Sequence, residues 1–149
     1  KIQDMIAVGE SEGARLVAGG TGLPEGVNRG YYVRPTVFAD VTNDMRIAQE
    51  EIFGPVLSII PFKDEADAIA ISNDTAYGLT NYVQTQDGAR RNRMARALKS
   101  GMVEMNGTSR AQGSPFGGMK MSGGAREGGA WGIEEFLEVK AVSGWDPDA

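Results

Sequence analysis

The chain has no histidine and no cysteine among its 149 residues. Without histidine there is no imidazole general base, which excludes a Ser-His-Asp triad and a histidine-rich metal site within these residues. Without cysteine there is no disulfide, no thiolate nucleophile and no zinc ribbon. No cluster of carboxylates has the spacing of metal ligands either, so we expect no metal site. Chemistry carried by this chain alone must therefore use carboxylates, lysine, tyrosine, serine or threonine.

Basic residues are also fewer than acidic ones: 15 Lys and Arg against 20 Asp and Glu give a net charge of -5. This balance predicts no nucleic-acid and no membrane partner, since phosphate binding depends on clustered basic residues. One basic run, residues 90–99, has its apolar residues at helical spacing. We interpret it as the solvated face of a helix that begins at Asp87; a nucleic-acid patch is the alternative. With no membrane-length apolar run and no apolar leader, we expect a cytoplasmic protein.

The first residues have the pattern of a helix that is already under way. Ile2, Met5, Ile6 and Gly9 follow the spacing of one helical face. No capping residue precedes Ile2, and the chain lacks an initiator methionine. We therefore expect a piece of a longer protein, cut inside or just before this helix; a processed natural terminus is the alternative.

Strands and helices are expected to alternate along the rest of the chain. The pattern predicts strands at residues 15–18, 31–38, 56–62, 79–85, 101–105 and 137–145. It predicts helices or helical turns at residues 45–51, 64–72, 88–99 and 131–135. The apolar run at 56–62 is typical of a strand buried on both faces, and Ala66, Ile69 and Ala70 are expected to face inward. This order predicts an α/β fold with a mainly parallel sheet and flanking helices.

Two short motifs match the acceptor pattern for N-linked glycosylation. They are the Asn-x-Thr sequences at residues 73–75 and 106–108. Because nothing in the chain indicates secretion, we interpret both as ordinary surface sequence.

The run from Gln49 to Val56 combines two acids and a ring at a tight turn before a strand. A carboxylate and a ring two residues apart lie on one side of an extended backbone, so Glu51 and Phe53 can point at one ligand. A carboxylate accepts hydrogen bonds from a ribose diol, and a ring packs against a flat heterocycle. In the alternative interpretation, the acids are merely solvated and Phe53 belongs to the core.

In this run the chain resembles the aldehyde dehydrogenase superfamily of NAD(P)-dependent enzymes. Glu-Glu-Ile-Phe-Gly-Pro-Val at residues 50–56 is similar to the cofactor signature of that family. Other blocks are similar to family blocks and occur in the same order: residues 30–38, 73–79, 114–123, 126–127 and 137–140. The resemblance covers essentially every residue. It implies that residues 1–136 are the C-terminal portion of a catalytic domain and that residues 137–149 form a terminal strand for oligomerisation.

The resemblance also implies cofactor contacts, with NAD or NADP as the cofactor. Glu51 would hydrogen-bond the nicotinamide ribose, and Phe53 would pack beside the nicotinamide ring. Lys1 falls where many members carry a lysine near the same ribose. Glu50 is expected to be the solvated neighbour.

Further residues are assigned by the resemblance to the aldehyde substrate and to assembly. Phe116 would line the aldehyde pocket, with residues 107–113 at its mouth, and Arg110 is either a contact for a carboxylate-bearing aldehyde or simply exposed. Glu127 matches an acid near the proton-release path; a structural pair with Arg126 is the alternative. Glu138 and the terminal strand would lie at the subunit contact of a homo-oligomer, because the edge of that strand is otherwise exposed.

The catalytic groups of the family are missing from these residues. In the family a cysteine thiolate attacks the aldehyde, hydride passes to NAD(P), and a glutamate-activated water hydrolyses the thioester. The resemblance implies that this cysteine and this glutamate lie upstream of Lys1. We therefore expect part of an enzyme that oxidises an aldehyde to an acid, with the isolated chain inactive. The alternative is a non-catalytic α/β binding or assembly module that kept the scaffold.

Overall fold

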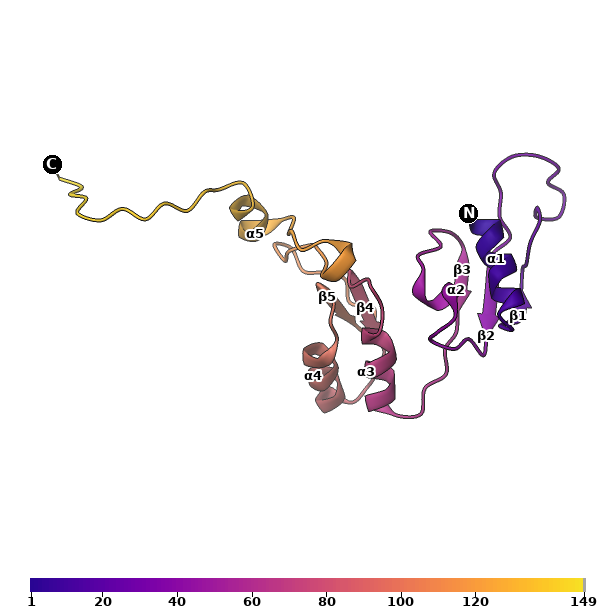
Figure 1. The fold of residues 1–149 in the computed structure, drawn as a ribbon. Helices are drawn as coiled ribbons and strands as arrows, with labels where there is room; N and C mark the ends of the chain where they lie inside the picture. Colours follow the sequence, from indigo (N-terminus) through magenta and orange to yellow (C-terminus); the bar gives the residue numbers. More distant parts are fainter. Residues whose placement is uncertain (149) are drawn as a thin grey trace. The chain divides into compact units, whose positions relative to one another are not determined.

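The structure, a computed structural model, describes residues 1–148, which divide into two compact units, Lys1–Ala76 and a second that begins at Tyr77. The first unit contains α1 (Ile2–Ser11), β1 (Arg15–Ala18), β2 (Thr36–Ala39), α2 (Arg46–Gln49), β3 (Val56–Ser58) and α3 (Glu65–Asn73) (Figure 1). The second unit contains β4 (Thr80–Val83), α4 (Gly88–Ala97), β5 (Met102–Met105), a short 3₁₀ helix η1 (Lys120–Ser122) and α5 (Gly129–Glu134). The predicted alternation of strands and helices is confirmed.

The strands form a three-stranded sheet in the first unit and a two-stranded sheet in the second. The first has the order β1-β2-β3, with β1 antiparallel to β2 and β2 parallel to β3. In the second, β4 and β5 are parallel, with Thr80 opposite Met102 and Val83 opposite Met105. Within residues 1–148 the α/β class with mainly parallel pairing is therefore confirmed, and β1 is its antiparallel exception.

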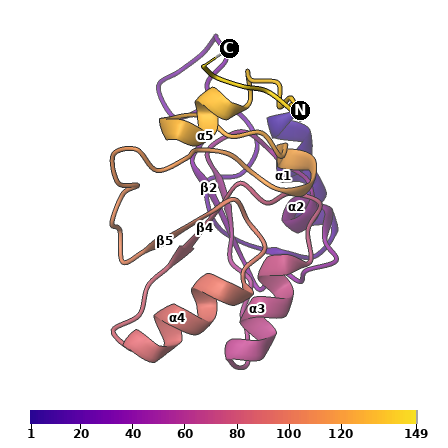
Figure 2. The same cartoon turned by 90° about the vertical axis from the view of Figure 1, so that its left-hand side faces the viewer.

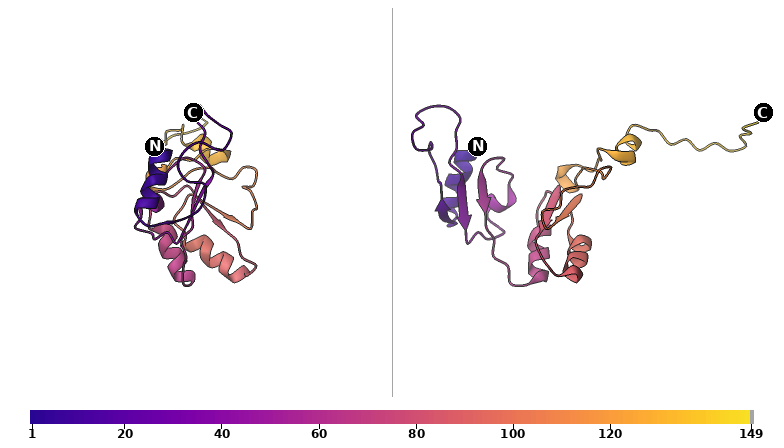
Figure 3. Two further views of the ribbon diagram at one scale, coloured as in Figure 1. Left: turned by 90° about the vertical axis from the view of Figure 1, so that its right-hand side faces the viewer. Right: turned by 180° about the vertical axis from the view of Figure 1, so that it is seen from behind.

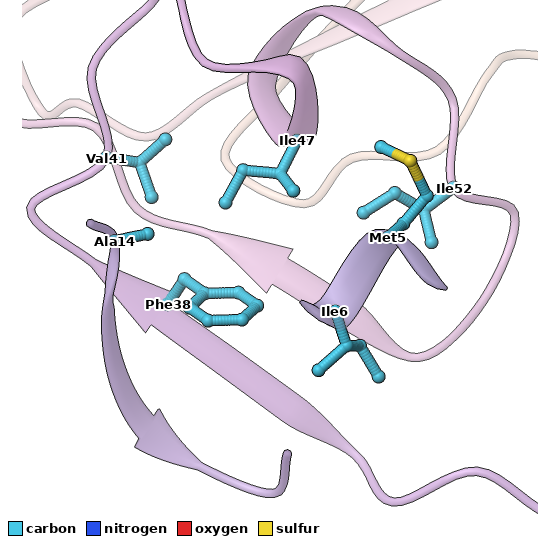
Figure 4. Packing of buried hydrophobic residues seen from close by; sticks show 7 residues of the cluster. All are labelled: Met5, Ile6, Ala14, Phe38, Val41, Ile47 and Ile52. Atoms are coloured by element: carbon cyan, nitrogen blue, oxygen red, sulfur yellow. The ribbon is translucent and has the colours of Figure 1, made fainter. Parts of the chain in front are cut away.

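The core of the first unit lies between its helices and its sheet. Its buried members are Met5, Ile6, Ala14, Phe38, Val41, Ile47 and Ile52 (Figure 4). Helix α1 contributes Met5, Ile6 and Gly9, so the helical pattern read at the start of the chain is confirmed. Helix α1 lies alongside β2 (Figure 3, right), and a Cβ on Gly9 would come within 3.1 Å of the Phe38 ring. Glycine at this position therefore allows α1 to approach the sheet closely.

Two predicted strands are shorter than expected. The strand predicted at 31–38 begins only at Thr36, because Pro35 has no N–H for the ladder and the residues before it form an exposed loop. The strand predicted at 56–62 ends at Ser58, before Pro61. Burial on both of its faces was wrong as well, since Leu57 is 57% exposed. Strand β3 has one described neighbour, β2, and nothing described covers its other side.

The position of α3 was predicted correctly, but the prediction that one of its faces is turned inward was wrong. Asp64 caps it as predicted, accepting a hydrogen bond of 2.9 Å from the backbone N–H of Asp67. No residue of α3 is buried: Ala66 and Ala70 are exposed, and Ile69 is half-buried. Its apolar residues spread around the helix and form no single stripe that one sheet face could cover.

In the second unit, α4 has the predicted cap and the predicted orientation of its apolar residues. The Asp87 carboxylate accepts hydrogen bonds from the backbone N–H groups of Ala89 and Arg90 at 2.8 and 3.1 Å. Met94 and Leu98 are buried, while the arginines of the helix are exposed, which confirms a solvated basic face. After β5 the chain runs as a long loop toward η1 (Figure 2).

The strand predicted at 137–145 does not form within the described residues. Residues 137–148 contain no helix or strand and run as an extended coil (Figure 1). A strand needs a neighbour to pair its N–H and C=O groups, and no described strand lies beside this segment. No helix found in residues 1–148 has both the length and the apolar character needed to cross a membrane.

Candidate functional site

The turn between α2 and β3 carries the predicted cofactor residues of the first unit. Ile52 is buried in the core, whereas its neighbour Phe53 is 84% exposed and has a positive φ of 55°. This backbone conformation is uncommon for a bulky residue and turns the ring away from the core. The alternative in which Phe53 is a core residue is therefore wrong. The next residue, Gly54, packs closely on α1, because a Cβ there would lie 2.7 Å from Cδ1 of Ile2 and the Ile2 side chain would have to move.

The two acids of this turn have different surroundings. Glu50 accepts a hydrogen bond of 2.7 Å from Arg46 Nε, one helical turn earlier. This bond is the main reason why the pKa of Glu50 lies below its ordinary value. Glu51 is exposed, and no hydrogen-bond or ion-pair partner is found for its carboxylate within residues 1–148. Glu50 is thus engaged within the chain, and Glu51 is free to accept hydrogen bonds from a ligand.

Lys1 lies near this turn. Its positive charge is the weakest of the effects that lower the pKa of Glu50. Lys1 also lines a cavity of about 630 Å³ together with Gln3, Leu23 and Tyr32. Its amino terminus is 3.2 Å from the Asp4 carboxylate. The structure therefore brings Lys1 into the region of Glu50.

Three predicted residues of the second unit lie together. Phe116 and Glu127 are joined by two backbone hydrogen bonds of 2.7 Å, each N–H donating to the other carbonyl. The guanidinium carbon of Arg110 lies 5.2 Å from the centre of the Phe116 ring, a cation–π contact. Phe116 itself is 38% exposed. The ring therefore has a basic group on one side and an accessible surface for an apolar ligand.

Arg126 follows the Gly123-Gly124 pair in the sequence and directly precedes Glu127. Its Nη1 donates hydrogen bonds to the carbonyl oxygens of Gly118, Gly124 and Ala125 at 2.7, 2.8 and 3.0 Å. Among the described residues Arg126 therefore bonds to backbone carbonyls and does not pair with the Glu127 carboxylate, which is exposed. The role of Glu127 in a proton path stays a prediction.

The loop after β5 bounds a cavity of about 510 Å³ that is lined by Arg91, Glu104, Thr108, Ser109 and Arg110, among others. Asn106 also lines this cavity, and the sequence did not lead us to predict it as a site residue. An Asn-Gly pair is a strong signal for a tight turn and could have identified this residue. Within residues 1–148 no group of three or more Asp or Glu residues is arranged to hold a metal ion.

Comparison with known proteins identifies the class to which these features belong. The family model for the aldehyde dehydrogenase family matches residues 1–142. The chain therefore belongs to the aldehyde dehydrogenase family, and the resemblance seen in the sequence is confirmed.

Individual relatives agree. A Pseudomonas 3-succinoylsemialdehyde-pyridine dehydrogenase is 49% identical over 98% of this chain and 31% of its own length. The crystal structure of an aldehyde dehydrogenase from Bartonella henselae is 62% identical with a TM-score of 0.93, over 97% of this chain and 30% of that one. Aldehyde dehydrogenase C from Pseudomonas syringae, solved with NAD+ and octanal, is 49% identical with a TM-score of 0.93, over 98% and 30%. The chain thus spans about 30% of the length of these relatives.

Proposed function

We propose that this chain is the C-terminal part of an NAD(P)-dependent aldehyde dehydrogenase that oxidises an aldehyde to a carboxylic acid. The observation that carries the proposal is the turn before β3, where Glu50 is engaged by Arg46 while Glu51 and Phe53 are exposed. A free carboxylate and an open ring two residues apart fit the ribose and the nicotinamide of a dinucleotide. Two of these features, the free acid and the exposed ring, have no structural use within the described residues.

In this proposal the chain binds and orients the cofactor, which when bound supplies a hydride acceptor. The Glu51 carboxylate accepts hydrogen bonds from the ribose hydroxyls. The Phe53 ring packs against the flat nicotinamide and limits its rotation. Lys1 lies near the same ribose and adds a positive charge to the region. A fixed ring matters because hydride transfer depends strongly on the distance and angle between the reacting atoms.

The second unit would supply part of the wall of the aldehyde pocket. Phe116 offers an apolar surface, and residues 107–113 form the mouth of the pocket. Arg110 extends this wall from its position over the Phe116 ring and, where it faces the substrate, would attract a carboxylate-bearing aldehyde. The solved relative with octanal shows that an uncharged chain is accepted by at least one member of the family.

The nucleophilic cysteine of the family has no counterpart in these 149 residues, which contain no cysteine, and the resemblance to the family assigns its general base to a glutamate outside them. We therefore propose that they lie upstream and that the isolated chain does not turn over aldehydes. The proposed enzyme is a cytoplasmic homo-oligomer, with residues 1–136 in its catalytic domain and residues 137–149, including Glu138, as the strand that pairs with a partner subunit.

Neighbouring carboxylates provide a matched test in the full-length enzyme. We expect Glu51→Gln to raise the KM for NAD or NADP by about tenfold, the cost of weakening a hydrogen bond to a charged group. Glu50→Gln removes only the charge from the exposed pair with Arg46 and should change that KM by less than about twofold. Steady-state kinetics at varied cofactor concentration measures both. Equal effects of the two substitutions would refute the assignment of Glu51, and a full-length protein that turns over no aldehyde would favour the non-catalytic module.

A further inference from the structure

The chain reverses direction after β5 through an Asn-Gly turn. Asn106 and Gly107 both have positive φ, 54° and 72°, and the backbone N–H of Thr108 donates to the carbonyl of Met105 at 3.0 Å. These are the features of a type I′ turn, which requires positive φ at both central positions. Asparagine is one of the few residues that adopts this conformation at low cost. The turn sets the direction in which the following loop leaves the sheet.

The side chain of Asn106 joins this turn to Thr85, two residues after the end of β4. Its Oδ1 accepts a hydrogen bond of 2.8 Å from the backbone N–H of Thr85, and its Nδ2 donates one of 3.0 Å to the carbonyl of Thr85. The backbone N–H of Asn106 also donates to the carbonyl of Val83 at 2.8 Å. The Asn106 carboxamide therefore extends the hydrogen-bonded pairing of β4 and β5 by one residue. Its oxygen and nitrogen take the places that a backbone C=O and N–H would have in a longer strand. A sugar on Nδ2 would remove one of these bonds, which argues against the glycosylation motif read at this position.

The loop that starts at this turn carries the candidate substrate wall. Asn106, Thr108, Ser109 and Arg110 line the 510 Å³ cavity, and Arg110 continues to the Phe116 ring. Thr108, Ser109 and Arg110 are exposed, so little described packing holds them. The hydrogen bonds between Asn106 and Thr85 hold the start of the loop, immediately before these exposed residues. A displacement at this point would shift Thr108 and Ser109, which follow it directly, and would change the position from which Arg110 reaches the Phe116 ring.

We propose that Asn106 is a positioning residue that holds this loop in place for the substrate, an inference that rests on the proposed aldehyde dehydrogenase function. It touches neither cofactor nor reacting atoms in the proposal. It acts through Thr85, by fixing where the loop begins. Loss of this contact is expected to weaken aldehyde binding and to leave cofactor binding, which belongs to the first unit, unchanged.

The first test follows the loop itself and needs no activity. Hydrogen–deuterium exchange of the full-length protein should show faster exchange across residues 107–115 in Asn106→Ala than in the wild type. The matched control is Asn81→Ala, which removes a 2.9 Å side-chain hydrogen bond to Ser100 from the same sheet. The control should leave exchange in 107–115 unchanged. Unchanged exchange in Asn106→Ala would overturn the inference, whether or not the protein turns over an aldehyde.

The second test separates positioning from stability. Asn106→Gly removes the side-chain bonds but accepts the positive φ without strain, so it should keep a higher melting temperature than Asn106→Ala. Both variants should raise the KM for the aldehyde by about tenfold, with the KM for NAD within about twofold of the wild type. A KM that recovers in Asn106→Gly together with the melting temperature would show a purely structural role and overturn the inference. A wild-type protein that oxidises no aldehyde would instead overturn the proposed function, and the exchange test would still decide whether Asn106 holds the loop.

Discussion

Gly101, the residue before β5, shows how a single hydrogen atom in place of a side chain can determine local packing. A Cβ built at this position would lie 1.9 Å from the carbonyl oxygen of Gly117 and 2.8 Å from the Cα of Gly118. Both neighbours are backbone atoms, which cannot rotate aside as the end of a side chain can. The Gly-Gly pair that follows Phe116 therefore crosses directly over the start of β5.

Replacing Gly101 should destabilise the protein far more than replacing a glycine with open space around it. We expect Gly101→Ala to lower the free energy of unfolding by about 3 kcal/mol, the upper range for overpacking. Gly124→Ala is the control, since a Cβ there meets nothing within 4 Å and its φ is not in the left-handed region. It should leave stability unchanged or raise it by about 0.5 kcal/mol. Chemical denaturation of the full-length enzyme measures both, and similar losses in the two variants would contradict this account of Gly101.

The two acids and the ring of the cofactor turn show what a sequence can and cannot reveal at this scale. The i,i+4 spacing of Arg46 and Glu50 makes their pairing readable in advance. For Phe53 the residue pattern left two positions open, beside a ligand with Glu51 or in the core, because Ile52 and Phe53 are adjacent apolar residues and either could have entered the core. The backbone decides between them: a positive φ at Phe53 turns its ring outward while Ile52 packs inside.

At the scale of elements, helix starts were the most predictable features. Asp64 and Asp87 cap α3 and α4 as their sequences indicate, because an N-cap depends on residues within one turn of each other. Strand ends were less predictable, since a strand is defined by its neighbours in space. In the segment at 59–62 the pairing with β2 ends at Ile59, whose backbone N–H donates to the carbonyl of Phe38 at 2.9 Å. No described strand pairs with the segment at 137–145, although its apolar pattern suits a strand. The prediction of an inward face for α3 was wrong for a related reason. A helix face is buried only where another element covers it, and no residue of α3 is buried.

The Asp87 cap makes α4 sensitive to acid. Hydrogen bonds from the backbone, first that of Arg90, hold the pKa of Asp87 below its ordinary value of 3.8. The ionised cap therefore stabilises the folded state at any pH above 3.8, and this contribution is lost as the pH falls through the lower pKa of the folded protein. Asp87→Asn keeps a capping acceptor without a charge, and Asp87→Ala removes the cap.

Melting temperatures measured from neutral pH downward can test this. We expect Asp87→Ala to be less stable than Asp87→Asn at every pH, because only the amide still accepts from the N–H groups of Ala89 and Arg90. The advantage of the wild type over Asp87→Asn should shrink once the pH falls below the ordinary pKa of an aspartate. An advantage that stays constant through that range would show that the charge of Asp87 does not contribute.

At the scale of the whole chain, apolar residues greatly outnumber the places in which they are buried. The hydrophobic fraction is 41%, yet only nine apolar side chains are buried among residues 1–148. Large apolar side chains are exposed in both units. They include Tyr31, Tyr32, Leu57 and Phe62 in the first, and Tyr82, Trp131, Phe136, Val139 and Trp145 in the second. Exposed apolar side chains in such numbers mark surfaces that contact other protein. In a chain that spans about 30% of the length of its relatives, these are the surfaces we expect the rest of a longer protein to cover.

The purified 149-residue chain can therefore be distinguished from the full-length enzyme by two measurements. We expect it to produce no NADH from aldehydes, because it contains no cysteine to attack the carbonyl. We also expect it to bind the dye ANS and to self-associate in size-exclusion chromatography, since its apolar surfaces remain uncovered. The full-length enzyme, in which these surfaces are covered, should bind little dye. NADH production by the chain alone would contradict the upstream position of the nucleophile. A monodisperse chain without dye binding would instead show that the scaffold is stable without the rest of the enzyme, as a non-catalytic module requires.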